Sequence, residues 1–552
     1  MAEEKRVRFR ANVKPKGKVA TAAARAAVSA MLGDAPLAKE YLIENLHRLQ
    51  DIAGCLSADN LAALAALMKL PMAAVYEVAT FYHHFDVVRD GDAVPPPVTV
   101  RVCQSLSCQM AGGAELLRQL QKAGGGHFRA IGAPCVGRCA CAPVAVVGQN
   151  ALENADVESA TLAAKQGQTA PQMPDAERFD AYTKGGGYDI YRKLLDGGLT
   201  ADAVIDEMEL SGLRGLGGAG FPLARKWRIV RGQKGDKVLA VNIDEGEPGT
   251  FKDRHYLEQQ PHCFLEGALI AARVVDAADV YIYLRDEYHG CRAMLAEEIK
   301  TLRAKADFAL PVLHLRRGAG AYICGEESAM IESIEGKRGE PRLRPPFVAE
   351  VGVFGRPTLE HNMETLHWVP KVLAKGGEWF AKQGRRGRAG LRSFSVSGRV
   401  RRPGVHVAPA GITVQELIDE FCGGMAEGEK FYAYLPGGAS GGILPAAMAD
   451  IPLDFDTVQG ADDNCFIGSA AVIVLSRKDR ARDAALNVMQ FFEDESCGQC
   501  TPCRVGTAKA AQLMQAKKWD APLLEELSKA MQDASICGLG QAAPNCLRSI
   551  IR

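Results

Sequence analysis

Apolar residues recur at the spacing of amphipathic helices early in the chain, and this pattern predicts a helical bundle at 19–90. Ser57 suits the N-cap of one of its helices, and Pro71 suits the first turn of the next. The expected helices cover 20–32, 38–54, Leu61–Leu70 and Met72–Phe85. Residues 1–18, ahead of the bundle, are expected to form a disordered basic arm.

A small α/β domain is predicted at 97–160. Val98–Val102 is an apolar, β-branched run typical of a strand, and it leads directly into a cysteine. A helix at about 113–123 and a strand at Val144–Val147 complete the pattern, so cysteines fall in loops that follow strands. The next segment, 161–187, is rich in Gln, Pro and Gly and is expected to be a linker.

The remainder of the chain predicts three domains, so the fold class is a multidomain α/β and α+β protein. Residues 188–385 alternate between buried strands and helices, 390–460 resemble a small β-grasp (SLBB-like) domain, and 475–552 are helical. In the first, strands are expected at Lys237–Ile243 and Asp279–Leu284, with helices at 262–275 and 290–305. In the second, strands are expected at Ser393–Val400, Val405–Ala408 and Lys430–Leu435 around a helix at Thr413–Phe421.

The composition of the chain argues against several classes of function. The 552 residues carry 66 basic and 66 acidic side chains, and this zero net charge argues against a nucleic-acid binder. No run of 18 apolar residues predicts a membrane span, and the basic N-terminus lacks the apolar region of a secretory signal. We therefore expect a cytoplasmic protein, whose 16 cysteines stay reduced.

One group of cysteines has the spacing of an iron–sulfur site. Cys497, Cys500 and Cys503 are each separated by two residues, and Cys537 follows after 33 more. Three closely spaced thiolates and one remote thiolate are typical of [4Fe–4S] ligation, whereas structural zinc more often uses two separated pairs. Cys546 is the competing fourth ligand; we favour Cys537 because it stands in a glycine-rich turn.

A second group predicts a [2Fe–2S] site. Cys103 and Cys108 form one pair, and Cys135 and Cys139 form another after 26 intervening residues. Four thiolates on two loops suit this smaller cluster, and zinc or free thiols are the alternative. Cys141 is a rival to Cys139, which we favour from its register with the other cysteine of its pair.

The stretch 212–222 is exceptionally rich in glycine, which lets a backbone approach a ligand closely. Gly215, Gly217 and Gly220 match the dinucleotide-binding fingerprint, which requires a preceding strand. Asp202–Leu210, immediately upstream, predicts a short acidic helix instead. The loop is therefore expected to bind a nucleotide-like cofactor in a fold other than the Rossmann unit.

Three further stretches are candidates for the same site. Residues 242–254 begin at the end of a predicted strand, where α/β proteins collect ligands, and are rich in acids. Residues 318–328 combine small residues with a carboxylate pair at the start of a helix, and 341–347 place two arginines among prolines, where they could hold phosphate. The alternatives are a solvated acidic turn, a helix cap and a basic surface loop.

Together, these stretches and cysteine groups resemble the flavoprotein arm of respiratory complex I, with its two NADH-end subunits fused in one chain. Residues 20–160 are similar to the smaller, thioredoxin-like [2Fe–2S] subunit, and 185–552 to the larger subunit with FMN, the NADH site and a [4Fe–4S] cluster. The runs Tyr281–Cys291 and His361–Thr365 look like the β (diaphorase) subunit of cytoplasmic, NAD-dependent formate dehydrogenases that contain molybdenum or tungsten.

The resemblance implies a set of cofactor-binding residues by position. The FMN contacts would be Gly215, Gly217, Lys226, Asn242, Asp244, Tyr322, Gly325, Glu326 and Asn362. The nicotinamide contacts would be Phe221 and Phe347, which stack on rings, and Glu247 and Glu327, which accept hydrogen bonds. The remaining candidates are Gly218, Glu245, Arg344 and His361. Leu216, His361 and Arg344 depart from the commoner complex I pattern of Arg, Asn and Lys.

The implied function is electron transfer between NAD(H) and a partner subunit. Hydride would pass between NAD(H) and FMN without a catalytic side chain, and single electrons would then move through the iron–sulfur clusters. In a formate dehydrogenase the electrons come from a separate α subunit that carries molybdenum or tungsten and further clusters, within a hetero-oligomer. The alternatives are the diaphorase subunit of a NAD-reducing hydrogenase and a zinc-stapled scaffold without redox activity.

Overall fold

The computed structural model describes residues 17–551, and the chain divides into two compact units, up to Val94 and from Pro95 onward. All but two residues of the expected basic arm, 1–18, lie outside the described residues. Among the residues that are described, no helix combines the length and apolar character needed to cross a membrane.

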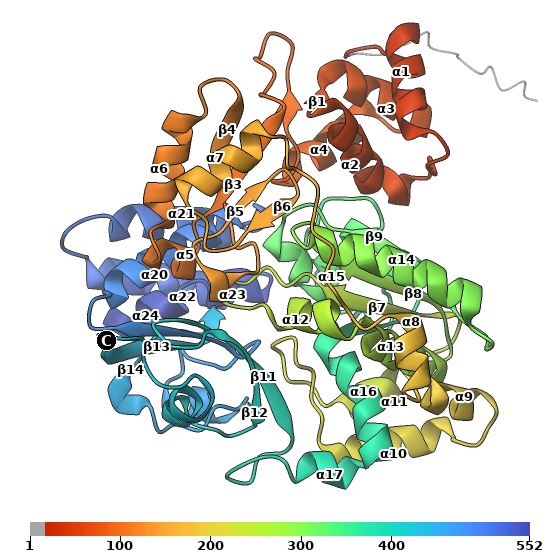
Figure 1. Cartoon of the computed structure of the whole chain (residues 1–552), viewed down its shortest axis with the longest axis vertical. Coiled ribbons are helices and arrows are strands. Elements are labelled where there is room, and N and C mark those ends of the chain that lie inside the picture. Colours follow the sequence, from red (N-terminus) through yellow and green to blue (C-terminus); the bar gives the residue numbers. More distant parts are fainter. Residues whose placement is uncertain (1–16, 552) are drawn as a thin grey trace, which may run out of the picture. The chain divides into compact units, whose positions relative to one another are not determined.

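The first unit is helical, as predicted (Figure 1). Ser57 accepts a hydrogen bond from the Asn60 N–H and caps the third helix. The fourth helix stops at Phe81 rather than Phe85, because Tyr82 turns to an extended conformation and buries its ring. The elements are α1 (Ala22–Leu32), α2 (Leu42–Ala53), α3 (Ala58–Met68) and α4 (Met72–Phe81), with the short strands β1 (Leu56–Ser57) and β2 (Val87–Val88).

The second unit begins with a four-stranded sheet in the order β4-β3-β5-β6. Its strands are β3 (Val98–Cys103), β4 (Phe128–Ala133), β5 (Ala145–Val147) and β6 (Asn150–Leu152). Helices α5 (Leu106–Met110), α6 (Gly113–Ala123) and α7 (Val157–Lys165) accompany it. Val100, Val102, Leu116 and Leu120 form part of its core. The strands β4 and β6 were not expected from the sequence.

Four parallel strands form the central sheet, in the order β10-β7-β8-β9. They are β7 (Lys237–Ile243), β8 (Ala277–Leu284), β9 (Val312–Arg317) and β10 (Thr358–Asn362). Asn242 pairs with Asn362, while Leu284 pairs with Ile243 and Arg317, so the carboxyl ends of all four strands align. Ligands bind at this edge in open α/β sheets.

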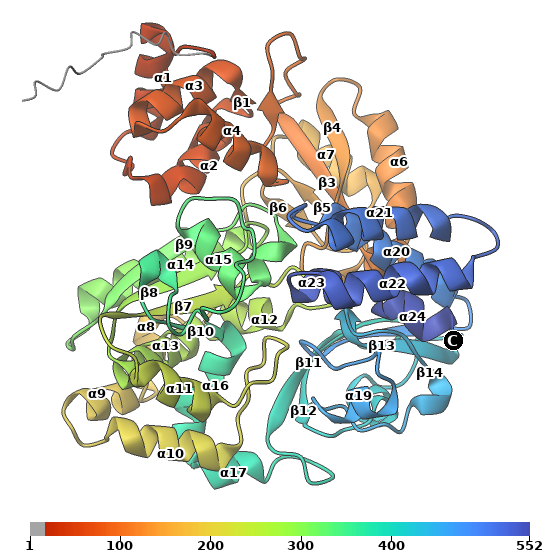
Figure 2. The same ribbon diagram turned by 180° about the vertical axis from the view of Figure 1, so that it is seen from behind.

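Helices cover both faces of the central sheet (Figures 1 and 2). Its helices are α8 (Phe179–Lys184), α9 (Asp189–Leu195), α10 (Ala201–Ser211), α11 (Leu223–Arg231), α12 (Lys252–Gln259), α13 (Pro261–Val275), α14 (His289–Lys305), α15 (Glu327–Ile334), α16 (Met363–Lys375) and α17 (Gly377–Ala381). Helices α13 and α14 are neighbours on one face, where His262 Nε2 lies 2.7 Å from Glu298 Oε2, whereas α15 contacts the other face, where Tyr283 Oη lies 2.9 Å from Ser333 Oγ. The segment 161–187, expected as a linker, contains the end of α7 and the whole of α8.

A five-stranded sheet follows, in the order β12-β11-β15-β13-β14. Its strands are β11 (Leu391–Gly398), β12 (Gly404–Pro409), β13 (Phe431–Ala439), β14 (Leu444–Pro445) and β15 (Ala471–Ser476). The expected helix is a short turn, α18 (Val414–Glu416), continued by a π-helical turn (Leu417–Phe421), and α19 (Thr457–Ala461) follows. The fully buried strand β15 lies beyond residue 460, so the sheet extends past the range assigned from the sequence.

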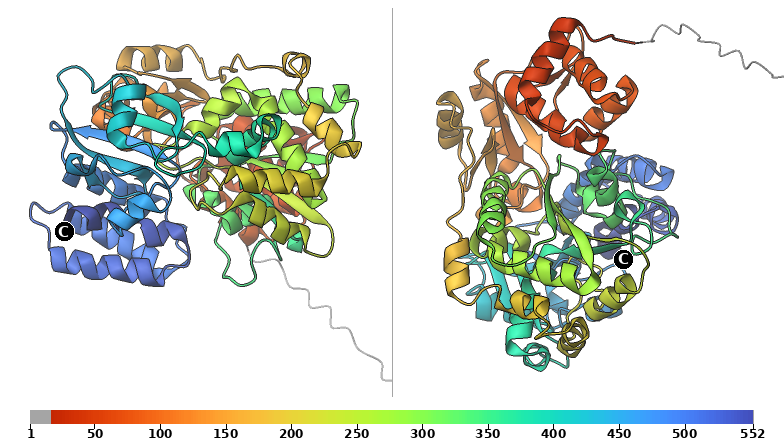
Figure 3. Two further views of the ribbon diagram at one scale, coloured as in Figure 1. Left: turned by 90° about the horizontal axis from the view of Figure 1, so that it is seen from below. Right: turned by 90° about the vertical axis from the view of Figure 1, so that its right-hand side faces the viewer.

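The C-terminal region is helical, as predicted, and packs beside the five-stranded sheet (Figure 3). Its helices are α20 (Ala481–Asp494), α21 (Thr501–Met514), α22 (Ala521–Ala534), α23 (Gly538–Ala542) and α24 (Asn545–Ile551). The Asn545 amide donates to the Ser440 carbonyl over 2.9 Å, and the Ile443 N–H donates to Ser549 Oγ over 2.9 Å. These contacts join α24 to the loop after β13.

Candidate functional site

The glycine-rich loop connects two helices, α10 and α11, and no strand precedes it. The N–H of Gly215 bonds to the carbonyl of Phe221 over 2.8 Å and closes the loop on itself. Gly220 has a φ of +62°, and a Cβ there would lie 2.6 Å from the Phe455 ring, so only glycine fits. The predicted local structure, a glycine-rich loop that follows a helix rather than a strand, is confirmed.

The loop lies against the carboxyl edge of the central sheet. A Cβ on Gly217 would come within 2.9 Å of the Cβ of Asn362, which ends β10. The N–H of Leu216 donates to Thr365 Oγ1 over 2.9 Å. Gly218, with a φ of +122°, faces Gly468 and Ser469. The sequence stretches at 212–222 and 361–365 therefore form one wall.

The end of β7 presents polar groups to the same edge. Asn242 Nδ2 donates to the carbonyl of Gly325 over 2.9 Å and to Glu360 Oε1 over 3.1 Å. Within the described residues, the buried Oδ2 of Asp244 has no hydrogen-bond partner. Burial raises the pKa of Asp244 well above its usual range. A buried acceptor without a partner fits a site completed by a polar ligand.

Tyr322 connects this edge to the C-terminal helical region. Asp244, Tyr322 and Glu495 line a shared pocket. The N–H of Tyr322 donates to Glu495 Oε2 over 2.8 Å, and its ring packs against Phe491 and Phe492. A Cβ on Gly246 would lie 3.2 Å from the Tyr322 ring, so the loops after β7 and before α15 are in close contact.

The carboxylate of Glu245 is engaged by the protein itself. It accepts hydrogen bonds from the N–H groups of Asp253 (2.9 Å) and Arg254 (3.2 Å) at the start of α12, and from Tyr288 Oη (2.7 Å). Burial, followed by the charge of Asp253, raises the pKa of Glu245 to about 7. Its contacts are those of a residue that shapes the loop.

Glu247 lies between the central domain and the five-stranded sheet. Its carboxylate accepts hydrogen bonds from the N–H of Ser440 over 2.9 Å and from Ser469 Oγ over 3.2 Å, and the Ser440 hydroxyl also donates to it. Burial raises the pKa of Glu247, and these serines act in the opposite direction. The five-stranded sheet thus fixes the orientation of this acid.

An ionic group joins α11, α15, β10 and the proline-rich loop. Lys226 Nζ lies 3.2 Å from Glu360, and Arg344 lies 3.0 Å from Glu327 and also contacts Glu326. Burial, followed by the charge of Glu360, raises the pKa of Glu327, so these carboxylates are close to one another. Glu326 also caps α15 through the N–H groups of residues 328 and 329. The structure thus brings together four stretches that are far apart in the sequence.

His361 and Asn362 are both bonded within the protein. His361 Nε2 accepts from Trp227 Nε1 over 2.7 Å, and burial lowers its pKa well below the usual range, so the ring is neutral. Asn362 Nδ2 donates to Asp253 over 2.6 Å, and its Oδ1 caps α16 and contacts the buried Lys252 at 3.3 Å. These side chains support the wall of the site rather than point freely into it.

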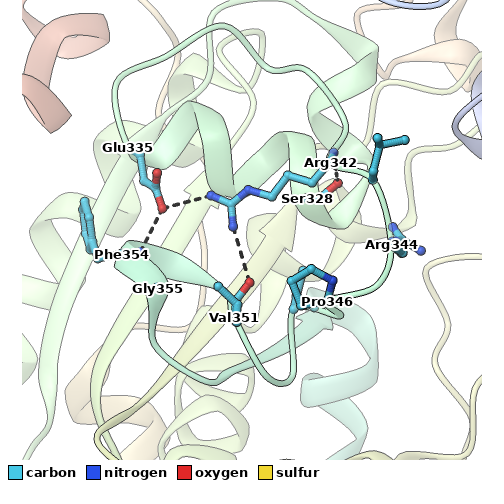
Figure 4. Close-up of a pocket in the computed structure, with 10 residues that line it drawn as sticks. Ser328, Glu335, Arg342, Arg344, Pro346, Val351, Phe354 and Gly355 are labelled. Atoms are coloured by element: carbon cyan, nitrogen blue, oxygen red, sulfur yellow. Dashed lines mark hydrogen bonds and ion pairs between the residues drawn. The ribbon is translucent and has the colours of Figure 1, made fainter.

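Two predicted stacking residues keep much of their ring surface exposed. Phe221 is 39% exposed and Phe347 is 54% exposed. Beside Phe347 lies a cavity of about 350 Å³, which is lined by Arg344, Pro346 and Val351 (Figure 4). Arg342 points toward Glu335 and is ion-paired there, which leaves Arg344 as the arginine of this loop that faces the carboxylate pair.

The first cysteine group converges as predicted. Cys103, Cys108, Cys135 and Cys139 are all buried, and the last two thiols lie 3.4 Å apart. Hydrogen bonds with Cys108 and Cys135 raise the pKa of Cys103 well above its usual range. Cys141 instead lies beside Glu153, and burial raises its pKa to about 11. The geometry favours Cys139 over its rival as the fourth ligand of this thiol set.

The second cysteine group also converges. Cys497, Cys500, Cys503 and Cys537 are close enough for their charges to influence one another, and a Cβ on Gly540 would lie 2.8 Å from the Cβ of Cys503. The Cys546 thiol points elsewhere and donates to the carbonyl of Ala439 over 3.2 Å. The donor set of four neighbouring thiols therefore fits an iron–sulfur cluster with Cys537 as its remote ligand.

Four family models match the chain in the order of its domains. They are the thioredoxin-like [2Fe–2S] ferredoxin at 28–166, the Nuo51 FMN-binding domain at 208–371, the SLBB domain at 393–444 and the NADH-ubiquinone oxidoreductase-F iron-sulfur binding region at 483–552. The chain is 39% identical to the F 2 subunit of NADH-quinone oxidoreductase from Rhizobium meliloti over 395 residues, which cover 69% of this chain and 93% of that protein. The chain belongs to the family of 51 kDa-type NADH-binding flavoprotein subunits.

Other members of this family show the same similarity. The chain is 40% identical to the mitochondrial NADH-ubiquinone oxidoreductase 51 kDa subunit of Neurospora crassa over 64% of this chain and 75% of that protein. A chain of NAD+-reducing [NiFe]-hydrogenase, solved in H2-reduced and air-oxidized states, superposes with a TM-score of 0.80 at 30% identity. This alignment covers 93% of our chain and 91% of that chain.

Membership in the 51 kDa-type family defines the class of chemistry. The chain is an FMN-, [2Fe–2S]- and [4Fe–4S]-binding oxidoreductase subunit that transfers electrons from NADH. The orphaned Asp244 oxygen, the glycine wall at Gly217 and the two thiol sets fit these groups. The expectations of fold class and of the four cofactors are confirmed. The association with formate dehydrogenase receives no support from these matches.

Five residues that contact the predicted site of this 51 kDa-type subunit were not identified as candidates from the sequence. Arg285, Lys252, Glu360, Ser440 and Glu495 all contact predicted site residues. Ser440 stands inside a glycine-rich run, and Glu495 precedes a cluster cysteine by two positions. Lys252 lies inside the candidate stretch 242–254 and Arg285 inside the run Tyr281–Cys291, but neither was singled out. Glu360 contacts the site through the tertiary fold.

Proposed function

We propose that this chain is the diaphorase subunit of a hetero-oligomeric enzyme, in which it exchanges electrons between NAD(H) and a separate catalytic subunit. The observation that carries the proposal is Tyr322, which lies at the edge of the central sheet with Asp244 and bonds to Glu495, close to the second thiol set. A flavin bound at this edge would lie near an iron–sulfur site. FMN, when bound, accepts a hydride from NADH and passes single electrons to the clusters.

The residues of the chain have distinct tasks in this proposal. The glycine wall at Gly215, Gly217 and Gly218 admits the flavin, and Asp244 offers its free oxygen to a polar edge of the ring. Lys226 supplies positive charge for the flavin phosphate, partly balanced by Glu360. The main-chain groups near Tyr322 and Gly325, and the capping carboxylate of Glu326, complete the binding set that we infer.

NAD(H) is proposed to bind over the exposed side of the flavin site. Phe221 and Phe347 present exposed rings for stacking, while Glu247 and Glu327 offer hydrogen-bond acceptors for polar groups of the dinucleotide. Arg344 would hold phosphate once Glu326 or Glu327 releases it. Glu245, His361 and Asn362 are proposed to hold the loops in place, since their side chains are already bonded within the protein.

The proposed electron donor is formate, oxidised in a separate α subunit that holds molybdenum or tungsten and further clusters. The support for this choice is the similarity of the runs Tyr281–Cys291 and His361–Thr365 to formate dehydrogenase diaphorases. A cytoplasmic location belongs to the same proposal, because thiolate ligands require a reducing environment.

A NAD-reducing hydrogenase is the second candidate assembly. It is favoured by the likeness over almost the whole chain to a solved chain of such a hydrogenase. Purification of the native complex under anaerobic conditions, followed by metal analysis of the partner, distinguishes the two. Molybdenum or tungsten with formate:NAD+ activity supports the formate assignment, while nickel with hydrogen oxidation contradicts it. NADH oxidation with artificial acceptors by the isolated chain tests the diaphorase assignment separately.

A further inference from the structure

A buried arginine joins the loop of the first thiol set to the loop after β7. Arg285 follows β8 and is 3% exposed. Its Nη2 donates to the carbonyl of Cys135 over 2.5 Å, and its Nη1 donates to the carbonyl of Glu245. One guanidinium thus bonds both to the backbone of a predicted [2Fe–2S] ligand and to the backbone of the flavin-site loop.

The surroundings hold this guanidinium in a defined place. Its Nε lies 3.1 Å from Glu287, and its Cζ lies 5.1 Å from the centre of the Tyr288 ring. The same tyrosine donates to the Glu245 carboxylate, and a Cβ on Gly137 would lie 2.3 Å from its hydroxyl oxygen. The packing therefore fixes the cysteine loop, the arginine and the acidic loop against one another.

Two other contacts to the cysteine loops bond to residues beside the ligands rather than to a ligand itself. Arg254, which like Arg285 is paired with a carboxylate, donates to the carbonyl of Gly137 over 2.9 Å and lies 2.6 Å from Glu258. Asn487 donates to the carbonyl of Gln104, beside Cys103, over 2.9 Å and carries no charge. Of these three residues, Arg285 is the one that bonds to the peptide of a predicted cysteine ligand itself.

We propose that Arg285 is a positioning residue that raises the reduction potential of the [2Fe–2S] cluster and couples it to the flavin-site loop. The potentials of iron–sulfur clusters depend on nearby charge, hydrogen bonds and burial. A fixed positive charge stabilises the more negative, reduced cluster, and this effect is strong where water is excluded. The proposal rests on the proposed ligand set of Cys103, Cys108, Cys135 and Cys139.

The test is a redox titration of the full chain, followed by the EPR signal of the reduced [2Fe–2S] cluster. In Arg285→Met, at the midpoint potential of the wild type, we expect the ratio of reduced to oxidised cluster to fall roughly ten-fold, which is about 59 mV for a one-electron couple. The [4Fe–4S] signal should titrate as in the wild type. Arg285→Lys, which keeps the charge, should recover at least half of the shift.

A second variant keeps the proposal falsifiable if Arg285→Met does not fold. Glu287→Gln removes the balancing negative charge and should shift the [2Fe–2S] potential in the opposite direction, upward. Asn487→Ala is the uncharged control and should leave the ratio within about two-fold of the wild type, since its removal changes no net charge. A shift of the same sign in Glu287→Gln and Arg285→Met, or an unchanged ratio in a cluster-loaded Arg285→Met, overturns the proposal.

A wrong assignment of the cysteine ligands would give a different result from a wrong role for Arg285. If the ligands are right, Cys139→Ala loses the [2Fe–2S] signal while the wild type retains it. Absence of the signal from the wild type, or its persistence in Cys139→Ala, refutes the ligand set on which the proposal rests. A change in the midpoint potential of a [2Fe–2S] cluster that is still bound therefore tests the role of Arg285 and not the ligand set.

Discussion

The backbone N–H of Tyr322 donates to the carboxylate of Glu495 over 2.8 Å, across 173 residues of sequence. Tyr322 begins the turn before α15 at the proposed flavin edge, and Glu495 stands two residues ahead of Cys497. This bond ties the second thiol set to the loop that we propose for the flavin site. With a flavin bound there, the bond would help to fix the distance between the flavin and the cluster.

Loss of this bond should slow electron transfer from the flavin to the [4Fe–4S] cluster. In Glu495→Ala, we expect NADH-driven reduction of the cluster to fall roughly ten-fold, because small misplacements of reacting groups have large kinetic effects. Stopped-flow absorbance of the iron–sulfur bands measures the rate. Glu495→Gln keeps an acceptor oxygen and should retain most of it. Glu493→Ala, on the exposed side of α20, is the control, and an equal loss there would refute this role.

The buried Glu245 should make stability depend on pH. Its pKa is raised from 4.5 to about 7, so its contribution to stability is complete below about pH 4.5 and is lost as the pH rises through 7. The upper bound of this loss is about 3 kcal/mol, from the size of the pKa change. Thermal unfolding should therefore show that the melting temperature of the wild type, relative to Glu245→Gln, falls between about pH 5 and pH 8. A difference that is constant or rises with pH would contradict the assignment.

Lys226 should matter for flavin retention. Replacement by Met removes the cation that faces Glu360 and leaves that carboxylate without its 3.2 Å partner. We expect the FMN dissociation constant of Lys226→Met to increase at least about ten-fold, which corresponds to about 1.4 kcal/mol. Flavin fluorescence after gel filtration measures the loss. Lys234→Met, at an exposed position of the following turn, should bind FMN as the wild type does.

The two rivals for the fourth [4Fe–4S] ligand should behave differently. Cys537→Ala should lose the [4Fe–4S] EPR signal and the corresponding iron and sulfide, because its thiol lies with the other three. Cys546→Ala should retain them, since the Cys546 thiol bonds to the carbonyl of Ala439. Iron analysis of the two purified variants decides the assignment. Loss of the cluster in Cys546→Ala alone would reverse it.

The sequence predicted most of what local spacing determines. The cysteine groups, the glycine-rich loop after a helix and the strand Lys237–Ile243 all follow from patterns within a few tens of residues. One departure is the helix predicted to Phe85, which stops at Phe81, where Tyr82 is extended and its ring is buried. Tertiary packing overrides local propensity at such points.

The supporting residues of the site could not be predicted, because their partners are remote in sequence. Arg285 bonds to a residue 150 positions away, and Glu247 is held by Ser440 at a separation of 193. His361 illustrates the opposite case. Its position beside the proposed flavin site was expected, but its side chain bonds to Trp227, and nothing in the sequence marks that pair.

Anaerobic titration of the purified, cofactor-loaded chain with NADH tests the central claim most directly. The account predicts bound FMN, iron in the amount required by one [2Fe–2S] and one [4Fe–4S] cluster, and bleaching of both flavin and iron–sulfur absorbance as NADH is added. A colourless protein that holds zinc in its cysteine groups, or a flavin that NADH does not reduce, would contradict it.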